Sequence, residues 1–361
     1  LLRILAVLLL VPAWAGSARA AEADLPFVRG FAETHAIPRA ERLVQAAASL
    51  AEGLGRFCAA PGEAGLVEAR AAFGAVLDGW MGIQHLRPGP LSMFMRAERM
   101  AFWPERNNSV ARQLAQVLAA RDPKALEPQA MARSSVATQG LTALEHILFA
   151  ERTAPAGFGG DEAGRYRCAY AAAIARNVNG MAEGIREEWA ELPGRLEGGA
   201  STSLAPTPAG AVDALYGGLV TAMQVVVDQK LLAPLGADAA AAKPRLAESV
   251  RSGRSLRNLG LNLEAIRAAL LGEGGGPGFL ARLPEGPEAA ALRTRVTATF
   301  DRAIDAVGTI GAPLDRAVAD PRRRPAVEAA FRAAKEAQGL VAQTLPPLLG
   351  ITLGFNELDG D

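Results

Sequence analysis

The sequence predicts an all-α protein made of two helical bundles in tandem. Apolar residues recur at three- and four-residue spacing in segment after segment, as along the buried face of an amphipathic helix. No segment shows the apolar-polar alternation that is typical of a half-buried strand. A stretch rich in Gly, Ser, Thr and Pro, residues 194–210, divides the chain and has no apolar stripe. We therefore expect one bundle over residues 21–193, a linker over 194–210 and a second bundle over 211–361.

Residues 1–20 predict a signal peptide that is cleaved after Ala20. Arg3 precedes an apolar run that ends near Ala15, and small residues at Ala18 and Ala20 precede the cut. The run is shorter than the ~17–25 residues that span a membrane, and no later segment looks both long and charge-free enough to do so. We therefore expect a soluble periplasmic protein that is not transmembrane after processing.

In the first half, the apolar stripes lie within residues 73–80, 110–118 and 174–189. Asp161 is a suitable N-cap for the third of these helices, and Pro193 is expected to end it.

In the second half, the stripes lie within residues 215–227, 256–270, 292–307 and 327–345. A Gly- and Pro-rich loop over 272–287 separates two of them. Two multi-helix halves of similar length suggest an internal duplication, although little residue-level repetition relates them. A single elongated bundle is the alternative architecture.

The charge of the chain excludes one class of partner. Its 38 Lys and Arg balance 38 Asp and Glu, and loss of Arg3 and Arg19 with the signal peptide leaves a small excess of acid. Such a chain lacks the positive field that nucleic-acid partners require, so we expect no nucleic-acid partner. Half of the residues are hydrophobic, and each half is long enough to bury a core.

The two cysteines, Cys58 and Cys168, predict one structural disulfide. In an oxidising envelope compartment this is the ordinary state of such a pair. A loop of roughly 110 residues closed in this way contributes about 4–5 kcal/mol in the chain-entropy treatment. A metal site made from two lone cysteines so far apart is the weaker alternative.

Several familiar catalytic motifs are missing from the sequence. It contains no HExxH of zinc peptidases, no GxSxG of hydrolases, no P-loop and no CxxCH for covalent haem. The mature chain has three histidines, His35, His85 and His146, which are too few for a multi-histidine site within either half. A metal bound here would also need carboxylate ligands.

Residues 139–149 carry the candidate site. If this stretch is helical, a rotation of about 100° per residue places Thr142, Glu145 and His146 on one polar face. In an ordinary amphipathic helix this face meets solvent. If the face lines a cleft, Glu145 can bind a cation, and His146 can join it or hydrogen-bond to it.

This stretch also carries a family resemblance. Gly140-Leu141-Thr142-Ala143-Leu144-Glu145 resembles the GxHxxE motif of the imelysin family. Residues 85–90, 102–106 and 353–361 resemble the branch of predicted periplasmic lipoproteins in that family. The resemblance implies an all-helical fold of two related bundles, a site near their interface and an association with bacterial iron uptake. Some members of the family are classed as metallopeptidases.

The chain departs from the family pattern in two ways. Thr142 replaces the motif histidine, the best first-row metal ligand, so Glu145 alone is carried over from that pair. His146 is adjacent but lies about 100° around the helix from Glu145. No cysteine follows the apolar run of residues 1–20, so the lipid anchor of this branch has no acceptor here.

Four further residues are candidates for ligand contact. His85 and Arg87 follow the end of an amphipathic helix and can cap its C-terminal dipole. As site residues, Arg87 offers a planar donor fork for a carboxylate of a siderophore or haem, and His85 offers a metal ligand. Trp103 is either a core anchor or one wall of a ligand pocket. Asn258 lies on a polar helical stripe that is either exposed or turned towards a ligand.

We expect a non-enzymatic periplasmic protein of iron or haem uptake that holds its ligand between the two bundles. Glu145, His146 and His85 are the predicted metal ligands, with iron or another divalent metal, or haem, as the bound group. An envelope uptake system is the expected partner. A metal-dependent peptidase that activates water on a bound cation is one alternative. An envelope protein whose helices engage a partner is the other.

Overall fold

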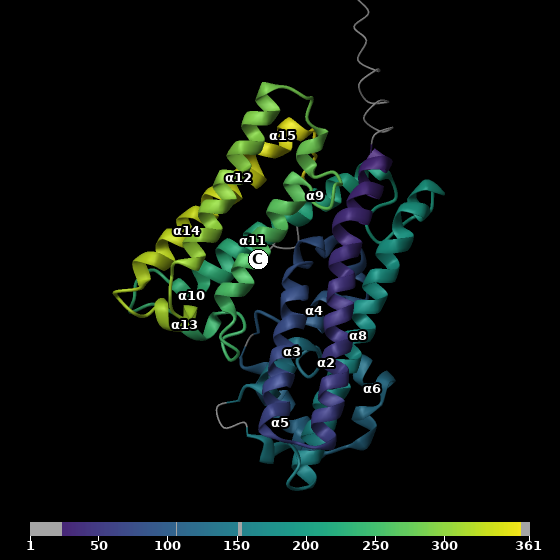
Figure 1. The fold of residues 1–361 in the computed structure, drawn as a ribbon, viewed down its shortest axis with the longest axis vertical. Coiled ribbons are helices and arrows are strands. Elements are labelled where there is room, and N and C mark those ends of the chain that lie inside the picture. The colour runs from purple at the N-terminus through teal and green to yellow at the C-terminus, as the bar shows by residue number, and fades with distance from the viewer. Residues whose placement is uncertain (1–23, 106, 151–153, 355–361) are drawn as a thin grey trace, which may run out of the picture.

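The computed structural model describes residues 24–105, 107–150 and 154–354, and all regular elements in these ranges are helices (Figure 1). The all-α prediction is therefore confirmed. The predicted signal peptide, residues 1–20, lies outside the described part of the chain, as does the end of the 353–361 segment.

The N-terminal half is built on three long helical stretches that run side by side (Figure 1). The first covers residues 24–59 and includes a π-helical segment, Ala32–Ala36, followed by α2 (Ile37–Ala59). The other two, α3 (Glu63–Met81) and α8 (Glu162–Glu197), both pack against α2. Their apolar faces meet to form the core of this half, because burial of those faces removes apolar surface from water.

Shorter helical elements connect these long helices. The α-helices are α4 (Arg96–Met100), α5 (Ser109–Ala120), α6 (Pro128–Ala132) and α7 (Gly140–Leu148). The 3-10 and π segments are η2 (Gln84–Leu86), η3 (Arg87–Leu91), η4 (Met93–Met95), η5 (Pro123–Leu126) and η6 (Pro155–Phe158).

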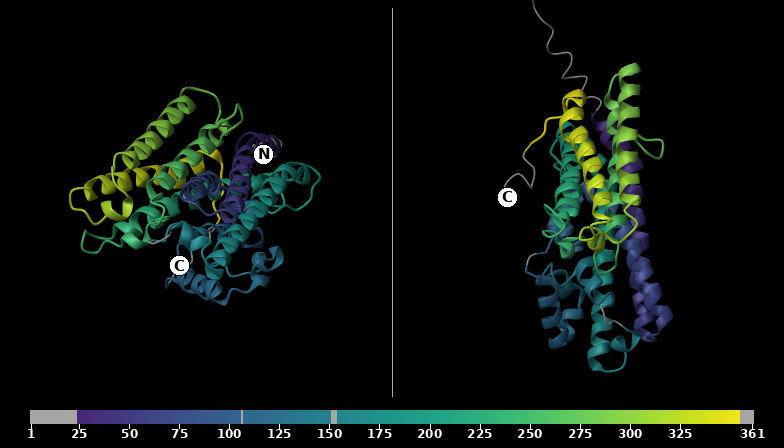
Figure 2. Two further views of the ribbon diagram at one scale, coloured as in Figure 1. Left: turned by 60° about the horizontal axis from the view of Figure 1, so that its bottom comes forward. Right: turned by 90° about the vertical axis from the view of Figure 1, so that its left-hand side faces the viewer.

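The C-terminal half contains its own set of long helices (Figure 2). They are α9 (Pro208–Gln224), α11 (Ser255–Leu271), α12 (Pro287–Gly308) and α14 (Arg324–Gly339). Helix α9 continues through η7 (Val225–Leu232) into α10 (Ala233–Leu235). Helix α14 continues through η10 (Leu340–Thr344) into α15 (Leu345–Leu349). Short elements join them, namely η8 (Pro244–Leu246), η9 (Phe279–Arg282) and α13 (Leu314–Ala317). Helix α12 packs against both α11 and α14.

Helix α8 begins as predicted but ends later. The Asp161 side chain accepts a hydrogen bond of 2.7 Å from the backbone N–H of Gly164, which confirms the predicted N-cap. The helix then continues through Pro193 to Glu197, so the predicted end before Pro193 was wrong. A proline removes one helical hydrogen bond, but Pro193 and its apolar neighbours are buried, and their packing keeps the last turn helical. The segment between α8 and α9 is therefore 198–207, and the division into two domains stays a prediction.

The predicted disulfide is confirmed. Cys58 and Cys168 are bonded, and their Cα atoms lie 5.5 Å apart. The bond joins the end of α2 to the first part of α8, across 110 residues of sequence.

One helical stretch in the described residues, Pro208–Leu235, is long and apolar enough to cross a membrane by length and composition. This differs from the prediction that no segment after residues 1–20 is long and charge-free enough to span a membrane. More than half of its most apolar window, 56%, is buried inside the fold. The Tyr216 hydroxyl on this helix donates a hydrogen bond of 2.7 Å to the backbone oxygen of Val341. We interpret the stretch as the core helix of the C-terminal half.

The two halves meet where α11 packs on α3 and where α9 packs on η2 and η3. Gly218 permits the second contact, since a Cβ atom there would lie 2.5 Å from the backbone oxygen of His85 and 2.8 Å from the ring of Pro88.

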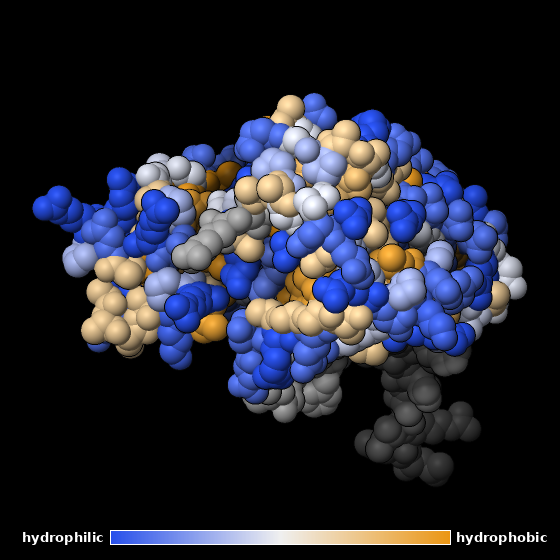
Figure 3. Space-filling model, turned by 90° about the horizontal axis from the view of Figure 1, so that it is seen from below, coloured by the Kyte–Doolittle hydropathy of each residue, from blue (hydrophilic) through white to orange (hydrophobic). Residues whose placement is uncertain are grey.

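Seen from below, hydrophilic residues cover much of the surface, and strongly hydrophobic ones show mainly in its hollows (Figure 3). The interface between the halves is where the polar site residues are buried.

Candidate functional site

A buried lysine lies at the contact between the halves. Lys230 is carried by the π-helical segment η7, and its side chain is 2% exposed. Its ammonium nitrogen lies 2.8 Å from Glu248 Oε2, 2.6 Å from Asn262 Oδ1 and 2.8 Å from Gln84 Oε1. These three oxygens match the three N–H donors of the lysine. Burial lowers the pKa of Lys230 from its ordinary value, although the carboxylate of Glu248 opposes this change.

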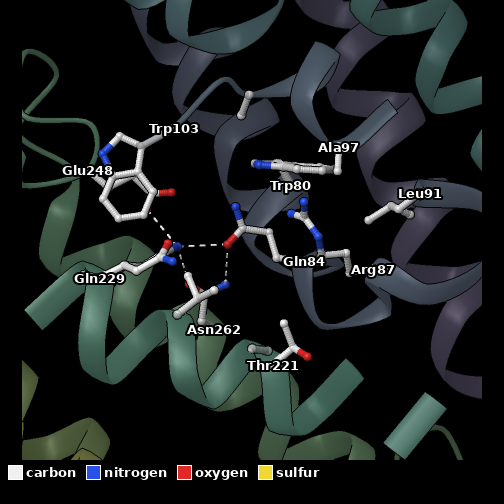
Figure 4. Close-up of a pocket in the computed structure, with 14 residues that line it drawn as sticks. Trp80, Gln84, Arg87, Leu91, Ala97, Trp103, Thr221, Gln229, Glu248 and Asn262 are labelled. Carbon is white, nitrogen blue, oxygen red and sulfur yellow. Dashed lines mark hydrogen bonds and ion pairs between the residues drawn. The ribbon is translucent and has the colours of Figure 1, made fainter. Parts of the chain in front are cut away.

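Lys230 also fixes the orientation of two amide side chains. Asn262 turns its oxygen to the lysine, so its Nδ2 donates to the backbone oxygen of Met81 at 2.8 Å and to Gln84 Oε1 at 3.1 Å. Because Lys230 can only donate, Gln84 must also turn its oxygen to the lysine. The amide nitrogen of Gln84 then points away from Lys230 and towards Trp80 (Figure 4).

A small cavity of about 70 Å³ opens beside this cluster (Figure 4). Both halves contribute to its walls: Trp80, Arg87 and Trp103 from the N-terminal half, and Thr221, Gln229 and Asn262 from the C-terminal half. The ring of Trp103 lies 5.9 Å from the ammonium nitrogen of Lys230, within cation–π range. Arg87 forms an ion pair with Glu98. Two predicted ligand-contact residues, Arg87 and Trp103, are thus brought together in one cavity.

Asn258 lies outside the cavity and contacts Glu248, which is part of the cavity wall. Its amide nitrogen donates to Glu248 Oε2 at 2.8 Å and to Ser249 Oγ at 3.0 Å, and its side chain is buried. It therefore orients the carboxylate that pairs with Lys230 and does not itself line the cavity. The polar stripe of α11 is turned inward and not towards solvent.

His85 takes part in a second buried cluster. Its Nε2 lies 2.6 Å from Nε2 of His35, and Nδ1 of His35 lies 2.6 Å from Glu273 Oε1. Arg39 donates to both oxygens of Glu273, at 2.6 and 3.0 Å. With neutral rings, His35 donates to Glu273 from Nδ1 and accepts from His85 at Nε2. Nδ1 of His85 has no hydrogen-bond partner in the described part of the chain.

Burial sets the protonation of this cluster. It lowers the pKa of His35 to about 4 and holds the pKa of His85 well below its ordinary value. Burial alone would raise the pKa of Glu273, but hydrogen bonds from His35 and Arg39 bring it down to about 2. The cluster therefore pairs a carboxylate with an arginine and keeps both imidazoles neutral near pH 7.

The motif helix α7 begins at a residue that must be glycine. Gly140 has φ +76°, and a Cβ atom there would lie 2.1 Å from the backbone oxygen of Arg99 and 2.6 Å from that of Met100. Only a residue without a side chain allows α7 to start so close to the end of α4. The motif glycine is therefore explained by packing.

The motif glutamate contacts the other half of the molecule. Glu145 is 6% exposed, and its Oε1 accepts hydrogen bonds from Ser252, from the backbone N–H at 2.8 Å and from the hydroxyl at 2.6 Å. Burial raises the pKa of Glu145, and the bonds from Ser252 oppose this change. Ser252 is four residues beyond Glu248, so one loop connects the motif to the cavity. The polar face of α7 thus lies at the interface and does not meet solvent.

The three predicted metal ligands have separate partners. Glu145 bonds to Ser252 and His85 to His35, while Nε2 of His146 lies 3.7 Å from Glu105 Oε1. Within residues 24–105, 107–150 and 154–354, no group of three or more His, Cys, Asp or Glu side chains is arranged to hold a metal ion. The structure therefore does not bring the predicted ligand set together.

Thr142, at the position of the motif histidine, is half-buried in α7, and its side-chain hydroxyl makes no hydrogen bond to the described residues.

The residues at the centre of these clusters are not among the site candidates that the sequence predicts. Lys230 carried one usable signal, since it stands with Asp228 between the apolar stripe of residues 215–227 and the apolar pair Leu231 and Leu232. Glu248 and Glu273 lie in loops with no local pattern, and nothing in the sequence relates them to Lys230 or His35.

Comparisons with known proteins agree with this architecture. The Imelysin family model matches residues 36–341. An imelysin-like protein from Psychrobacter arcticum has a similar structure, with a TM-score of 0.76 and 18% identity over 93% of this chain and 98% of that one. A protein from Parabacteroides distasonis described as an iron-regulated protein A precursor has a TM-score of 0.70 and 16% identity, over 89% and 94% of the two chains. No curated protein sequence matches the chain.

Proposed function

The chain belongs to the imelysin family, and on that premise we propose that it is a non-enzymatic binding protein of the bacterial cell envelope that serves iron uptake. The similarity to an iron-regulated protein A precursor supports the link to iron. The Cys58–Cys168 disulfide and the signal-like sequence of residues 1–20 support a periplasmic location, since disulfides persist in oxidising compartments. We propose an envelope uptake system as its partner.

The observation that carries the proposal is the Lys230–Glu248 pair beside a cavity between the halves. A buried ion pair stabilises a fold little, because desolvation of both charges offsets their attraction. Polar groups that converge on an otherwise apolar cavity are typical of a ligand site. We therefore propose that ligand binding takes place in this cavity.

The size of the cavity favours a small ligand over haem. Its volume is about 70 Å³, against roughly 300–1,000 Å³ for pockets that enclose drug-sized molecules. A group of a few heavy atoms fits this space, whereas a porphyrin does not. We therefore propose a small ligand connected with iron uptake and give up haem as the bound group.

The role in iron uptake is tested in cells. A strain that lacks the protein should grow more slowly than its parent in iron-limited medium and equally fast in iron-replete medium, and the wild-type gene should restore growth. Equal growth under iron limitation would contradict the proposal. Peptide hydrolysis by the purified protein, lost in Glu145→Gln, would favour the metallopeptidase alternative and also contradict it.

A further inference from the structure

We propose that a groove between α4, α6 and α8 docks an acidic peptide segment of a partner protein, with Phe94 at its rim and Arg99 and Arg176 as its cations. None of the described residues lines both this groove and the cavity beside Lys230. The inference therefore goes beyond the proposed function and does not rest on it. Three features carry it, namely an exposed apolar rim, a groove of suitable size and positive charge without acid.

The first feature is a pair of large apolar side chains that the fold leaves in solvent. Phe94 is 69% exposed and Met95 is 57% exposed, the two highest values among the large apolar side chains of the described residues. Both residues have left-handed backbone, with φ 55° and 54°, which is unfavourable for any residue with a side chain. The guanidinium of Arg96 lies over the Phe94 ring at 5.5 Å. Strained residues that hold apolar side chains in water are typical of a contact surface.

The second feature is the groove beside Phe94, which has a volume of about 350 Å³. Its walls come from η4 and α4, from η5 and α6, and from α8, against which the other segments pack (Figure 1). Ala173 and Met181 are buried residues of α8 and give the groove apolar surface, as do Leu126 and Pro128. Sites that enclose small ligands have roughly 300–1,000 Å³, so this groove can accept side chains of a bound peptide.

The third feature is the charge of the groove. Its charged lining residues are Arg96, Arg99 and Arg176, and none of the described lining residues is Asp or Glu. Arg96 is paired with Glu188 at 2.6 Å and is not available. Arg99 donates only to neutral oxygens, of which the side-chain one is Oε1 of Gln139 at 3.3 Å. Arg176 is exposed and makes no hydrogen bond or ion pair with the described residues.

Two guanidiniums without an acid favour carboxylates as the bound group. A guanidinium matches the planar shape of a carboxylate and donates to both of its oxygens. The pKa of Arg99 is lowered from its ordinary value, first by burial and then by the charge of Arg96. A negative group in the groove would relieve this unfavourable interaction between like charges.

The charge of the whole chain favours a peptide over an anionic membrane. Its 38 basic side chains are balanced by 38 acidic ones, so no strong field draws it to a charged surface. Anionic lipids are recognised by clusters of about 4–8 Lys or Arg, more than this groove offers. A concave site with apolar walls suits alternate side chains of a peptide, with acids at Arg99 and Arg176 and an apolar residue at Phe94.

Fluorescence anisotropy of a labelled peptide, measured with the purified mature protein, tests the inference. The probe is fluorescein-labelled Glu-Leu-Glu-Glu-Leu-Glu, which should bind saturably with a Kd below about 1 mM. Replacement of its glutamates by glutamine should weaken binding at least about tenfold, and replacement of its leucines by alanine should weaken it severalfold. No saturable binding, or equal binding of the glutamine peptide, would overturn the proposal.

Gly180 provides a variant that fills the groove without disturbing the fold. It lines the groove, and nothing lies within 4 Å of a Cβ atom added there. Gly180→Glu should weaken binding of the probe at least tenfold, because it offers its own carboxylate to Arg176 one helical turn earlier. Gly180→Ala should bind as wild type does. Gly55→Glu in α2 is the matched control, since its added Cβ also meets nothing within 4 Å and it does not line the groove. Equal losses in Gly55→Glu and Gly180→Glu would overturn the placement of the site.

Arg176→Gln removes one of the cations and should weaken binding about threefold, as for loss of an exposed ion pair. Arg165→Gln should leave binding unchanged, because Arg165 is an exposed arginine of the same helix outside the groove. The protein should not sediment with vesicles that contain about one-third phosphatidylglycerol. Sedimentation that is lost in Arg176→Gln would mean that a lipid surface occupies the groove, and would overturn the proposal.

Discussion

Glu145 Oε1 accepts two hydrogen bonds from Ser252, a residue 107 positions further along the chain. The motif glutamate of α7 is therefore a contact between the two halves of the molecule. In this chain, with threonine at position 142, its observed role is to hold the loop that also carries Glu248.

Glu145→Gln should lower the free energy of unfolding by about 1–2 kcal/mol. The amide keeps the shape of the side chain but weakens two bonds that a charged acceptor strengthens. The gain from removing a buried charge offsets part of the loss, because burial raises the pKa of Glu145. Urea unfolding measures the change, with exposed Glu63→Gln as the control. A change within about 0.5 kcal/mol, as for an ordinary surface residue, would argue against a role in joining the halves.

Lys230→Met should destabilise the protein by about 3–5 kcal/mol, because it leaves Glu248 buried without its partner. The double variant Lys230→Met with Glu248→Gln should recover most of this loss, since no uncompensated charge then remains. Lys335→Met, at an exposed position, should be neutral. Denaturant midpoints of the variants compare these effects. A double variant no more stable than Lys230→Met would contradict the pairing.

Gly140→Ala should lower the free energy of unfolding by at least about 2 kcal/mol. The new Cβ atom would overlap the backbone oxygens of Arg99 and Met100, and φ +76° disfavours any L side chain. Gly180→Ala in α8 is the control, because nothing lies within 4 Å of its added Cβ and alanine favours the helix. Thermal melts should show a large fall for the first variant and none for the second. Similar melting temperatures would mean that α7 can move away from α4.

Stability should fall as the pH decreases from about 6.5 to about 4. In this window the unfolded chain protonates His35, whereas the folded protein keeps it neutral because its pKa is about 4. The unfolded state then binds more protons, so the free energy of unfolding rises with pH by up to about 1.4 kcal/mol per unit for each such group. The pKa of His85 is also lowered in the folded protein, so His85 makes the free energy of unfolding rise with pH in the same way. Glu273 has a pKa of about 2 in the folded protein, below its ordinary 4.5, so it extends the loss of folding stability to pH values below 4.5.

Urea unfolding across pH 4–7 measures this slope. His35→Gln should flatten it by about one proton, because the variant removes one titrating group. An unchanged slope in the variant would show that His35 does not titrate as the buried cluster predicts.

The fold could be predicted from the sequence because helical periodicity is a local signal. The stripes of residues 73–80 and 174–189, the Asp161 cap and the disulfide all follow from nearby residues or from the compartment. The end of α8 could not be predicted in the same way. Pro193 is a helix breaker by local rules, and the burial that keeps it helical depends on the rest of the fold.

The candidate site was only partly predictable for a related reason. Arg87 and Trp103 were recognised as ligand-contact candidates from their chemistry, and both line the cavity. The pairing of Lys230 with Gln84 and that of Arg39 with Glu273 join residues 146 and 234 positions apart. Such contacts arise only when the two halves pack, and periodicity carries no information about them.

The most direct test of the account is iron content in cells grown under iron limitation. The strain that lacks the protein is complemented with wild type, with Trp80→Phe plus Gln84→Glu, or with Trp189→Phe, each at an equal level of folded protein. We predict that wild type and Trp189→Phe restore cellular iron and that the double cavity variant does not. Full restoration by the double cavity variant would contradict the claim that ligand binding between the two halves is what the protein contributes to iron uptake.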